Sequence, residues 1–375
     1  MENSRKIKIL CVTGSFKFGG GQRQLTNILK LLDRERFEVA VCTFRKEGAY
    51  LSEVPSDVCI YELATRNHRG NLLPHVWQLR DLIQREKPDV LYSHLAGSNV
   101  KLGLAHMTLR RSSHPNLIVS VANNPQHYSR RRRHLMKMLY PRATAICPVS
   151  AGMKDALILA GYPKEKMHFI PNAVDTAYVR KLADQPLDHP WLKTGNPILV
   201  SVSRLVPQKA YQNLLLSFRQ IAESVPSYLW IIGDGPERGK LESLSQELKL
   251  EEHVEFLGFQ PNPFKYMARA DLFVLSSLWE GLASVLVEAG ALGLPIVASR
   301  APYGTEEVVQ DGENGFLVPV QDIDGISERV IFLLQNDDIR VRCAEASRRI
   351  VEERFSAEVV VRQFEALFCK HAKDL

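Results

Sequence analysis

The stretch PILVSVSRL (residues 197–205) restarts a pattern with which the chain begins. The first run opens with the short apolar segment IKILCVTG (7–14), which a glycine-rich loop and the helical segment QRQLTNILKLLDR (22–34) follow. In both runs short β-rich segments alternate with helical ones. Strands that alternate with helices are typical of parallel sheets, so the sequence predicts an α/β protein of two Rossmann-like, doubly wound domains.

The expected elements follow each other closely along the chain. In the first run further strands are expected at 37–44, 89–94, 116–122 and 145–150. In the second run we expect helices at 211–224 and 236–249 and strands at 228–235, 254–259, 271–277 and 295–299. Ligands of such sheets bind beyond the carboxyl ends of the strands. Two domains that face each other there would enclose a deep cleft, where a small molecule could bind.

A length of 375 residues also favours two domains over one. The stretch ADQPLDHPWLKTGNP (183–197) is rich in proline and polar residues and is the expected join. The predicted domains are therefore 1–185 and 190–355. An apolar content of 45% and a charged content of 24% are those of a soluble globular protein. We find no signal-peptide pattern and no apolar run that could span a bilayer, so a cytoplasmic location is expected.

The charge is distributed unevenly between the two halves. Residues 1–185 hold 29 Lys and Arg against 15 Asp and Glu, whereas the remaining residues hold 19 against 27. This asymmetry indicates an anionic partner for the first half.

The most basic segment is HYSRRRRHLMKMLYPRA (127–143), in which basic and apolar residues are interleaved. Its basic residues are Arg130, Arg131, Arg132, Arg133 and Lys137. The pattern is typical of an amphipathic segment on an anionic membrane surface, and a solvated helix face is the alternative. Since no helix-turn-helix, zinc or stacking motif is present, nucleic acid is not an expected partner. A peripheral position on the cytoplasmic face of a membrane and a lipid-linked substrate would follow.

Two stretches favour the binding of phosphate groups. FGGGQRQ (18–24) places Gly19, Gly20 and Gly21 between the first strand and the first helix, where backbone N–H groups could contact a phosphate. A plain tight turn is the alternative. SVSRLVPQK (201–209) places Arg204 and Lys209 just beyond a strand, where two cations could neutralise a diphosphate. They could also be ordinary surface cations.

SLWEGLASVLVEAGALGLP (277–295) places two glutamates, Glu280 and Glu288, in a stretch that otherwise resembles protein core. A carboxylate there is costly unless hydrogen bonds reach it, and sugars are rich in hydroxyl donors. We expect Glu280 in a loop and Glu288 a turn into the next helix, where it could bind ribose hydroxyls. The free backbone N–H groups at the helix start should be those of Leu282, Ala283, Ser284 and Val285. A helix glutamate in an ion pair is the alternative for Glu288.

Taken in order, these stretches resemble one known family. Glu280 to Glu288 resembles the E-x7-E signature of the retaining glycosyltransferases of family four, which have the GT-B fold. SRLVPQK resembles their G-R-L-x-x-x-K segment and GGGQ their G-G-x-E/Q loop. Further similar segments are IPNAVD (170–175), GDGPERGKLE (233–242), GLPIVAS (293–299) and DGENGFLVP (311–319). The resemblance covers nearly the whole chain.

The resemblance implies a role for each of these residues. Gly19 to Gly21, Arg204 and Lys209 would hold the donor diphosphate, Glu288 the ribose, and Glu280 with the 282–285 backbone the transferred sugar. Gly258, Phe259 and Gln260 would lie beside the base, and His94 beside the donor sugar. The implied catalytic residues are His94, Glu280, Arg204 and Lys209. The last helix, 356–375, would cross back onto the first domain.

The sequence departs from the family pattern at four places. The stretch EGLASVLVE (280–288) lacks the commoner G-F-G-L-P pattern. Ser203 and Ala210 stand where relatives have glycine. Ala122 stands where many relatives have histidine, which leaves Asn123 and Asn124 as candidate acceptor contacts.

The predicted activity is the retaining transfer of a hexose or N-acetylhexosamine from a nucleotide diphosphate sugar, with UDP expected from the family's commonest donors. The acceptor would be a glycan or a lipid-linked saccharide of the cell envelope. No cofactor or metal is expected, because Asp322 and Asp324, the one D-x-D pair considered, precede a helix that they could cap. The alternatives are a nucleotide-sugar epimerase of the same fold and a non-catalytic nucleotide-sugar-binding membrane adaptor.

Overall fold

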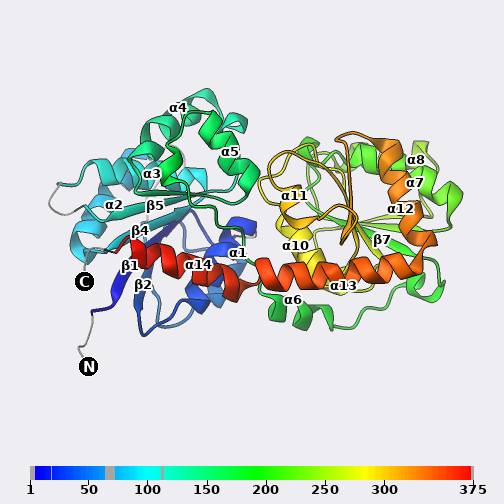
Figure 1. The fold of residues 1–375 in the computed structure, drawn as a ribbon, viewed down its shortest axis with the longest axis horizontal. Helices are drawn as coiled ribbons and strands as arrows, with labels where there is room; N and C mark the ends of the chain where they lie inside the picture. Colours follow the sequence, from blue (N-terminus) through cyan, green and yellow to red (C-terminus); the bar gives the residue numbers. More distant parts are fainter. Residues whose placement is uncertain (1–4, 18, 64–71, 111–113, 373–375) are drawn as a thin grey trace. The chain divides into compact units, whose positions relative to one another are not determined.

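The computed structural model describes residues 5–17, 19–63, 72–110 and 114–372. The chain forms two compact units (Figure 1). Unit 1 consists of the described residues up to Ala173 together with those from Ala357, and unit 2 is Val174–Ser356. Each unit has its own sheet and its own core.

Unit 1 is built on a six-stranded parallel sheet of order β3-β2-β1-β4-β5-β6. Its strands are β1 Ile7–Thr13, β2 Phe37–Thr43, β3 Cys59–Glu62, β4 Val90–His94, β5 Asn116–Val121 and β6 Ala145–Pro148. Its helices are α1 Gly20–Leu31, α2 Leu72–Glu86, α3 Ala96–Met107, α4 Arg130–Leu139, α5 Ala151–Leu159 and α14 Ala357–Lys370.

Unit 2 has a six-stranded parallel sheet of order β12-β11-β10-β7-β8-β9. Its strands are β7 Ile198–Val202, β8 Tyr228–Ile232, β9 Val254–Gly258, β10 Leu272–Leu275, β11 Ile296–Ser299 and β12 Gly315–Val318. Its helices are α6 Thr176–Ala183, α7 Tyr211–Ser224, α8 Arg238–Glu247, α9 Phe264–Met267, α10 Ser284–Ala291, α11 Thr305–Val308, α12 Ile323–Gln335 and α13 Asp337–Arg354.

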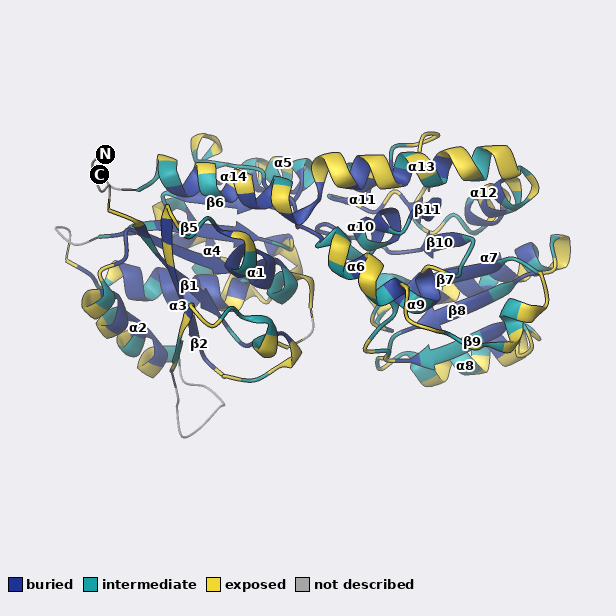
Figure 2. Cartoon of the chain, turned by 90° about the horizontal axis from the view of Figure 1, so that it is seen from below, coloured by how far each residue is buried: buried dark blue, intermediate teal, exposed yellow. Residues whose placement is uncertain are grey.

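The central strands are nearly continuous apolar runs because helices cover both faces of each sheet. Figure 2 shows this layering, with buried strands inside each unit and exposed residues on the outer sides of the helices. The last helix, α14, contacts α1 and packs two phenylalanines into the core of unit 1. The rings of Phe364 and Phe368 lie edge-on to Tyr92, with ring centroids 5.4 and 5.8 Å away.

The strand order identifies the place where each sheet binds a ligand best. In unit 1 the chain reverses its direction of travel across the sheet between β1 and β4, which are neighbours. In unit 2 the same reversal falls between β7 and β10. Open α/β sheets bind their ligands at such a reversal, beyond the carboxyl ends of the strands.

The expected join at 183–197 lies inside unit 2. The boundary between the two units falls between Ala173 and Val174. The physical reason is that the end of α6 is hydrogen-bonded to residues that flank α9. Asn262 Nδ2 donates to Leu182 O at 2.8 Å, and an Arg269 guanidinium nitrogen donates to Ala183 O at 2.9 Å. Residues 174–185, which were expected in the first domain, therefore belong to the second.

Candidate functional site

The candidate site lies at the carboxyl edge of the unit 2 sheet, where β7 and β10 are neighbours. The loop after β7 carries Arg204 and Lys209, and the loop after β10 carries Glu280. Lys209 and Glu280, which are 71 residues apart in the sequence, are thus brought into contact at this edge of the sheet. This is the position at which open α/β sheets bind ligands.

Lys209 and Glu280 form a buried ion pair. The distance from Lys209 Nζ to Glu280 Oε1 is 2.5 Å, and their side chains are 12% and 8% exposed. The hydroxyl of Ser277 donates to the same oxygen, Glu280 Oε1, at 2.6 Å. The carboxylate is therefore compensated inside the protein, as a buried charge must be.

The two loops are also held together through their backbones. Leu278 N donates to Gln208 O at 2.8 Å, and Gln208 Nε2 donates to Trp279 O at 2.7 Å. The hydroxyl of Ser276 donates to the carbonyl oxygens of Lys209, at 2.9 Å, and of Ala210, at 3.1 Å. The backbones that carry the lysine and the glutamate are thus fixed relative to each other.

On its other side the Glu280 loop lies against the loop after β11. Glu280 N donates to Pro302 O at 3.2 Å. A Cβ at Gly304 would lie 2.0 Å from Gly281 O, so only glycine permits this close approach. Gly304 therefore helps to fix the position of the loop that carries Glu280.

Helix α10 begins four residues after Glu280, and Ala283 precedes its first turn. The first N–H groups of a helix have no partner within it, so this end favours oxygen-rich anions. Glu288 lies one turn into α10 and is half-buried. The structure therefore places Leu282, Ala283, Ser284 and Val285 at the helix start and Glu288 on the same short helix.

The two predicted diphosphate ligands differ in environment. The side chain of Arg204 is exposed, whereas Lys209 is directed to Glu280 rather than standing apart from it. Ala210 has a left-handed conformation, with φ 46° and ψ 44°, which glycine adopts more readily than alanine.

The predicted base-binding residues end β9 at the same edge of the sheet. Gly258 has φ +66°, and its carbonyl oxygen accepts a hydrogen bond from Gly233 N at 2.8 Å. Phe259 is exposed, and Gln260 Nε2 donates to Leu257 O at 2.8 Å. A Cβ at Gly233 would lie 1.9 Å from Ser203 O, so this glycine allows the loops after β7 and β8 to touch.

Unit 1 brings His94 and the glycine loop together at its own point of reversal. His94 ends β4 and is 2% exposed, and its Nδ1 lies 3.2 Å from the hydroxyl oxygen of Tyr92. Its Nε2 is buried and has no hydrogen-bond partner among the described residues. Burial lowers the pKa of His94 to about 4, so the imidazole is neutral at pH 7.

Gly21 packs directly on this histidine. Gly20 is the first residue of α1 and Gly19 precedes it, so the helix begins within the glycine run rather than at residue 22. A Cβ at Gly21 would lie 2.8 Å from His94 Cδ2 and 2.7 Å from Leu95 Cδ2. Leu95 itself has φ +90°, an unusual conformation for leucine that occurs beside the candidate residue.

The two asparagines after β5 have different environments. Asn124 is buried, and its side chain accepts a hydrogen bond from Gln126 N at 2.9 Å, which caps a short 3₁₀ helix. Asn123 is exposed. The capping bond gives Asn124 a structural role, and Asn123 remains a candidate for acceptor contact.

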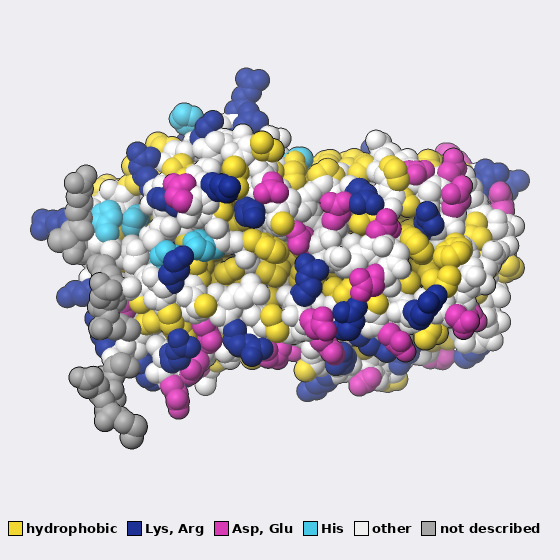
Figure 3. Space-filling view, viewed as in Figure 1, with side chains coloured by type: hydrophobic (Ala, Val, Ile, Leu, Met, Phe, Trp, Pro, Cys, Tyr) yellow, Lys and Arg dark blue, Asp and Glu magenta, His cyan; other side chains and the backbone are white. Residues whose placement is uncertain are grey.

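The basic segment forms α4, and its basic residues are on the surface. Arg130, Arg131, Arg132, Arg133 and Lys137 are all exposed. The apolar residues Met136 and Leu139 are buried against the unit, which contacts α4 through α3. Figure 3 shows basic side chains projecting at the edge of unit 1 where α4 lies. The helix therefore has a basic exposed side and a buried apolar side, with Leu135 and Met138 half-buried between them.

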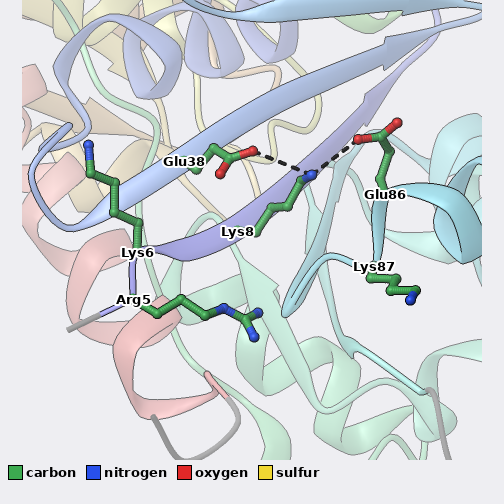
Figure 4. Close-up of a pocket in the computed structure, with 6 residues that line it drawn as sticks. All are labelled: Arg5, Lys6, Lys8, Glu38, Glu86 and Lys87. Atoms are coloured by element: carbon green, nitrogen blue, oxygen red, sulfur yellow. Dashed lines mark hydrogen bonds and ion pairs between the residues drawn. The ribbon is translucent and has the colours of Figure 1, made fainter. Parts of the chain in front are cut away.

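A separate pocket of about 410 Å³ lies at the opposite, amino-terminal edge of the unit 1 sheet (Figure 4). It is lined by Arg5, Lys6, Lys8, Glu38, Glu86 and Lys87. Lys8 Nζ lies 3.4 Å from Glu38 Oε1 and 3.1 Å from Glu86 Oε2, so both carboxylates of the lining are paired with this lysine. It is not where parallel sheets bind ligands.

The D-x-D pair is accounted for by local structure. Asp322 caps α12, and its side chain accepts a hydrogen bond from Gly325 N at 2.8 Å. Asp324 accepts one from Gln220 Nε2, also at 2.8 Å. Within the described ranges, no three His, Cys, Asp or Glu residues gather as metal ligands would. None of the described helices has the length and apolarity needed to span a bilayer.

Comparisons with known proteins agree with this arrangement. Residues 18–178 match the family model described as Glycosyltransferase Family 4, and residues 188–350 match that of glycosyl transferases group 1. HepE from Anabaena, crystallised with UDP and glucose, superposes with a TM-score of 0.81 at 24% identity, over 97% of this chain and 99% of that one.

Two relatives are similar over almost their full length. The lipopolysaccharide core biosynthesis glycosyltransferase LpsE of Rhizobium meliloti is 26% identical over 92% of this chain and 94% of its own. The N-acetyl-alpha-D-glucosaminyl L-malate synthase of Bacillus anthracis is 26% identical over 98% of both chains.

Two Rossmann-like parallel units in this order, similar throughout to HepE, define the GT-B fold. The two family models together extend over most of the sequence. The chain belongs to the group 1, family 4 glycosyltransferases.

Proposed function

We propose that this glycosyltransferase moves a hexose or N-acetylhexosamine from a UDP-sugar to a saccharide of the cell envelope, with retention of anomeric configuration. HepE was crystallised with UDP and glucose, and LpsE is named for lipopolysaccharide core biosynthesis. One relative from Campylobacter jejuni is named as a transferase to a diphospho-undecaprenol-linked sugar. A lipid-linked saccharide is accordingly the proposed acceptor.

The observation that carries this proposal is the buried Glu280 carboxylate beyond the carboxyl ends of the neighbouring strands β7 and β10. It would accept hydrogen bonds from hydroxyls of the donor sugar. Arg204, Lys209 and the start of α10 would stabilise the negative charge that develops on the leaving diphosphate. Glu288 would bind the ribose, and the Gly258–Gln260 backbone would face the base. His94 and Gly19–Gly21 are the proposed contribution of unit 1 to the donor.

In the proposed reaction an acceptor hydroxyl oxygen forms a bond to the anomeric carbon on the face from which the diphosphate departs. The bond from that carbon to the phosphate oxygen breaks, and its electron pair remains on the diphosphate. The leaving phosphate oxygen takes the proton of the acceptor hydroxyl. Neither a covalent enzyme intermediate nor a metal ion is part of this proposal, since the cations of the site can balance the leaving group.

The test is transfer from radiolabelled UDP-, GDP- and ADP-sugars to a membrane-lipid extract. Label should enter the lipid or glycan fraction from a UDP-sugar, survive addition of EDTA, and fall at least a hundredfold in E280Q but not in the exposed control E251Q. Release of nucleotide diphosphate without a labelled acceptor would support an epimerase. Donor binding without any turnover would support an adaptor.

We also propose that α4 attaches the protein peripherally to an anionic membrane on the cytoplasmic side. The support is its exposed basic face, and each basic group near such a surface contributes about 1 kcal/mol. Because Met136 and Leu139 are buried, these two side chains would not insert, and the attachment would be mainly electrostatic.

The matched test compares two variants that lose the same charge. In R130S/R131S/R132S/R133S the charge is lost from one face, whereas in K6S/K164S/K240S/R342S it is lost from scattered exposed positions. Co-sedimentation with vesicles containing anionic phospholipid should fall strongly only in the first variant, and salt should release the wild-type protein. Equal binding by both variants would refute the role of α4.

A further inference from the structure

The two serines that follow β10 have different tasks at the crevice. Ser276 donates to the backbone carbonyls of Lys209 and Ala210, so it fixes the main chain beneath the lysine. Ser277 donates to a side chain instead, the Oε1 atom of Glu280, at 2.6 Å. Ser277 is completely buried, and its own carbonyl oxygen accepts a hydrogen bond from the Ser299 hydroxyl at 2.5 Å.

This geometry leaves part of the glutamate for a ligand. A carboxylate has two oxygens and about four lone-pair positions. The bonds from Lys209 and Ser277 both use Oε1, and neither uses Oε2. Oε2 can therefore accept hydrogen bonds from hydroxyl groups while Oε1 stays bonded to the protein.

The two anchors differ in their freedom to move. Lysine carries a point charge on a flexible four-carbon stem, and a diphosphate in the crevice would attract its ammonium group. Serine has a short side chain, and Ser277 is enclosed between the end of β10 and the end of β11. When a diphosphate draws Lys209 away from Glu280, the serine bond can persist.

We propose that Ser277 is a positioning residue, which holds Glu280 Oε1 so that Oε2 faces the hydroxyls of the transferred sugar once Lys209 has turned to the diphosphate. This inference rests on the proposed function, since it requires a sugar diphosphate in the crevice. Lys209 would then pair with Glu280 only in the ligand-free protein, whereas Ser277 would bond to Glu280 both with and without the sugar diphosphate.

The experiment compares S277A with S201A. Ser201 is also a buried serine of unit 2, on β7, but its hydroxyl lies 3.4 Å from the Tyr211 hydroxyl and does not touch Glu280. Calorimetry would measure the binding of UDP and of the UDP-sugar to each variant, and initial rates would give kcat and KM. Both variants lose one buried hydroxyl, so a general loss of packing should affect them alike.

In S277A the affinity for UDP should stay within about twofold, whereas the gain in affinity that the sugar provides and the value of kcat should each fall about tenfold, as expected for a hydrogen bond to a charged group. S277C, whose thiol is a weak donor, should lie between S277A and the wild type. In S201A the ratio of the affinity for the UDP-sugar to that for UDP should be the same as in the wild type.

The inference would be overturned if the UDP-sugar gained as much affinity over UDP in S277A as in the wild type. It would also be overturned if S277A and S201A lost affinity for UDP to the same extent. A wild-type protein that binds no nucleotide diphosphate would overturn the proposed function itself. That outcome is seen before any variant is made, so the two failures are distinguishable.

Discussion

The ion pair of Lys209 and Glu280 couples the stability of unit 2 to its chemistry at the scale of single residues. Removing one member of a buried pair leaves an uncompensated charge. K209M should therefore lower the free energy of unfolding by about 3 kcal/mol. K209M/E280Q should recover most of this loss because no charge is left buried, yet it should remain inactive.

Urea unfolding of the wild type, both single variants and the double variant would measure this coupling. The expected result is a large interaction free energy between the two positions. Additive losses would show that the two side chains do not compensate each other in solution.

His94 provides a second prediction, which concerns pH. Its pKa is about 4 in the folded protein and about 6.5 in an unfolded chain. Between these values the unfolded state binds more protons, so the stability falls as the pH falls below 6.5. From pH 7.5 to pH 5 the share of His94 in this loss should be about 2 kcal/mol.

H94Q should show a smaller loss of stability over the same pH range, by that amount, in urea unfolding. H134Q, which changes an exposed histidine on α4, serves as the control and should follow the wild type. Identical pH profiles for H94Q and the wild type would mean that His94 titrates normally when the protein is folded.

At the scale of elements, the loop after β11 supports the Glu280 loop through Gly304. G304A would force a Cβ to within 2.0 Å of Gly281 O, so one of the two loops must move. We expect a loss of about 1–3 kcal/mol in stability, as for other overpacked positions, together with weaker binding of the UDP-sugar.

The control for Gly304 is G239A on α8, because a Cβ there meets no atom within 4 Å. Thermal unfolding should show G239A at or above the wild-type midpoint, since alanine favours a helix. If G304A retained wild-type donor affinity, this loop would have no part in placing Glu280.

The elements that the sequence predicts well are those with a strong pattern. Helix 211–224 and the buried strands lie where expected, because continuous apolar runs and helical periodicity are local signals. The edge strands β3 and β12 were not expected. Strand β3 is short and partly solvent-exposed, and β12 has a strand partner, β11, on one side only. The expected boundary between the domains differs from that of the units because the hydrogen bonds that join α6 to unit 2 link residues far apart in the sequence, which leave no local signal.

The same limit applies to the candidate site. The positions of Glu280 and Lys209 beyond the ends of strands could be predicted, since parallel strands end at one edge of their sheet. Their direct pairing could not, because side-chain contacts between loops have no local signal. Ser277 was missed for the same reason, although two serines directly after a buried strand are a clue. The burial of the apolar side of α4 likewise depends on its neighbour α3.

At the scale of the whole molecule, unit 1 is completed by residues from the other end of the chain. Phe368 on α14 is fully buried among aromatic residues of that unit. F368A should destabilise unit 1 by about 3–5 kcal/mol, the usual cost for a buried phenylalanine. The exposed control is L159A on α5, where the side chain is 89% exposed.

Hydrogen exchange followed by mass spectrometry would locate the effect. In F368A, peptides from β1, β4 and β5 should exchange faster, whereas those from β7 and β10 should keep their wild-type protection. Faster exchange in both units would show that they unfold together.

This return of the chain has a consequence for biosynthesis. Residues 174–356 are translated before α14, so the surface of unit 1 that receives this helix lacks its partner during that time. Unit 2 is contiguous, so although it is synthesised second, it can reach its native state first. The core of unit 1 can therefore be completed only after α14 has been synthesised.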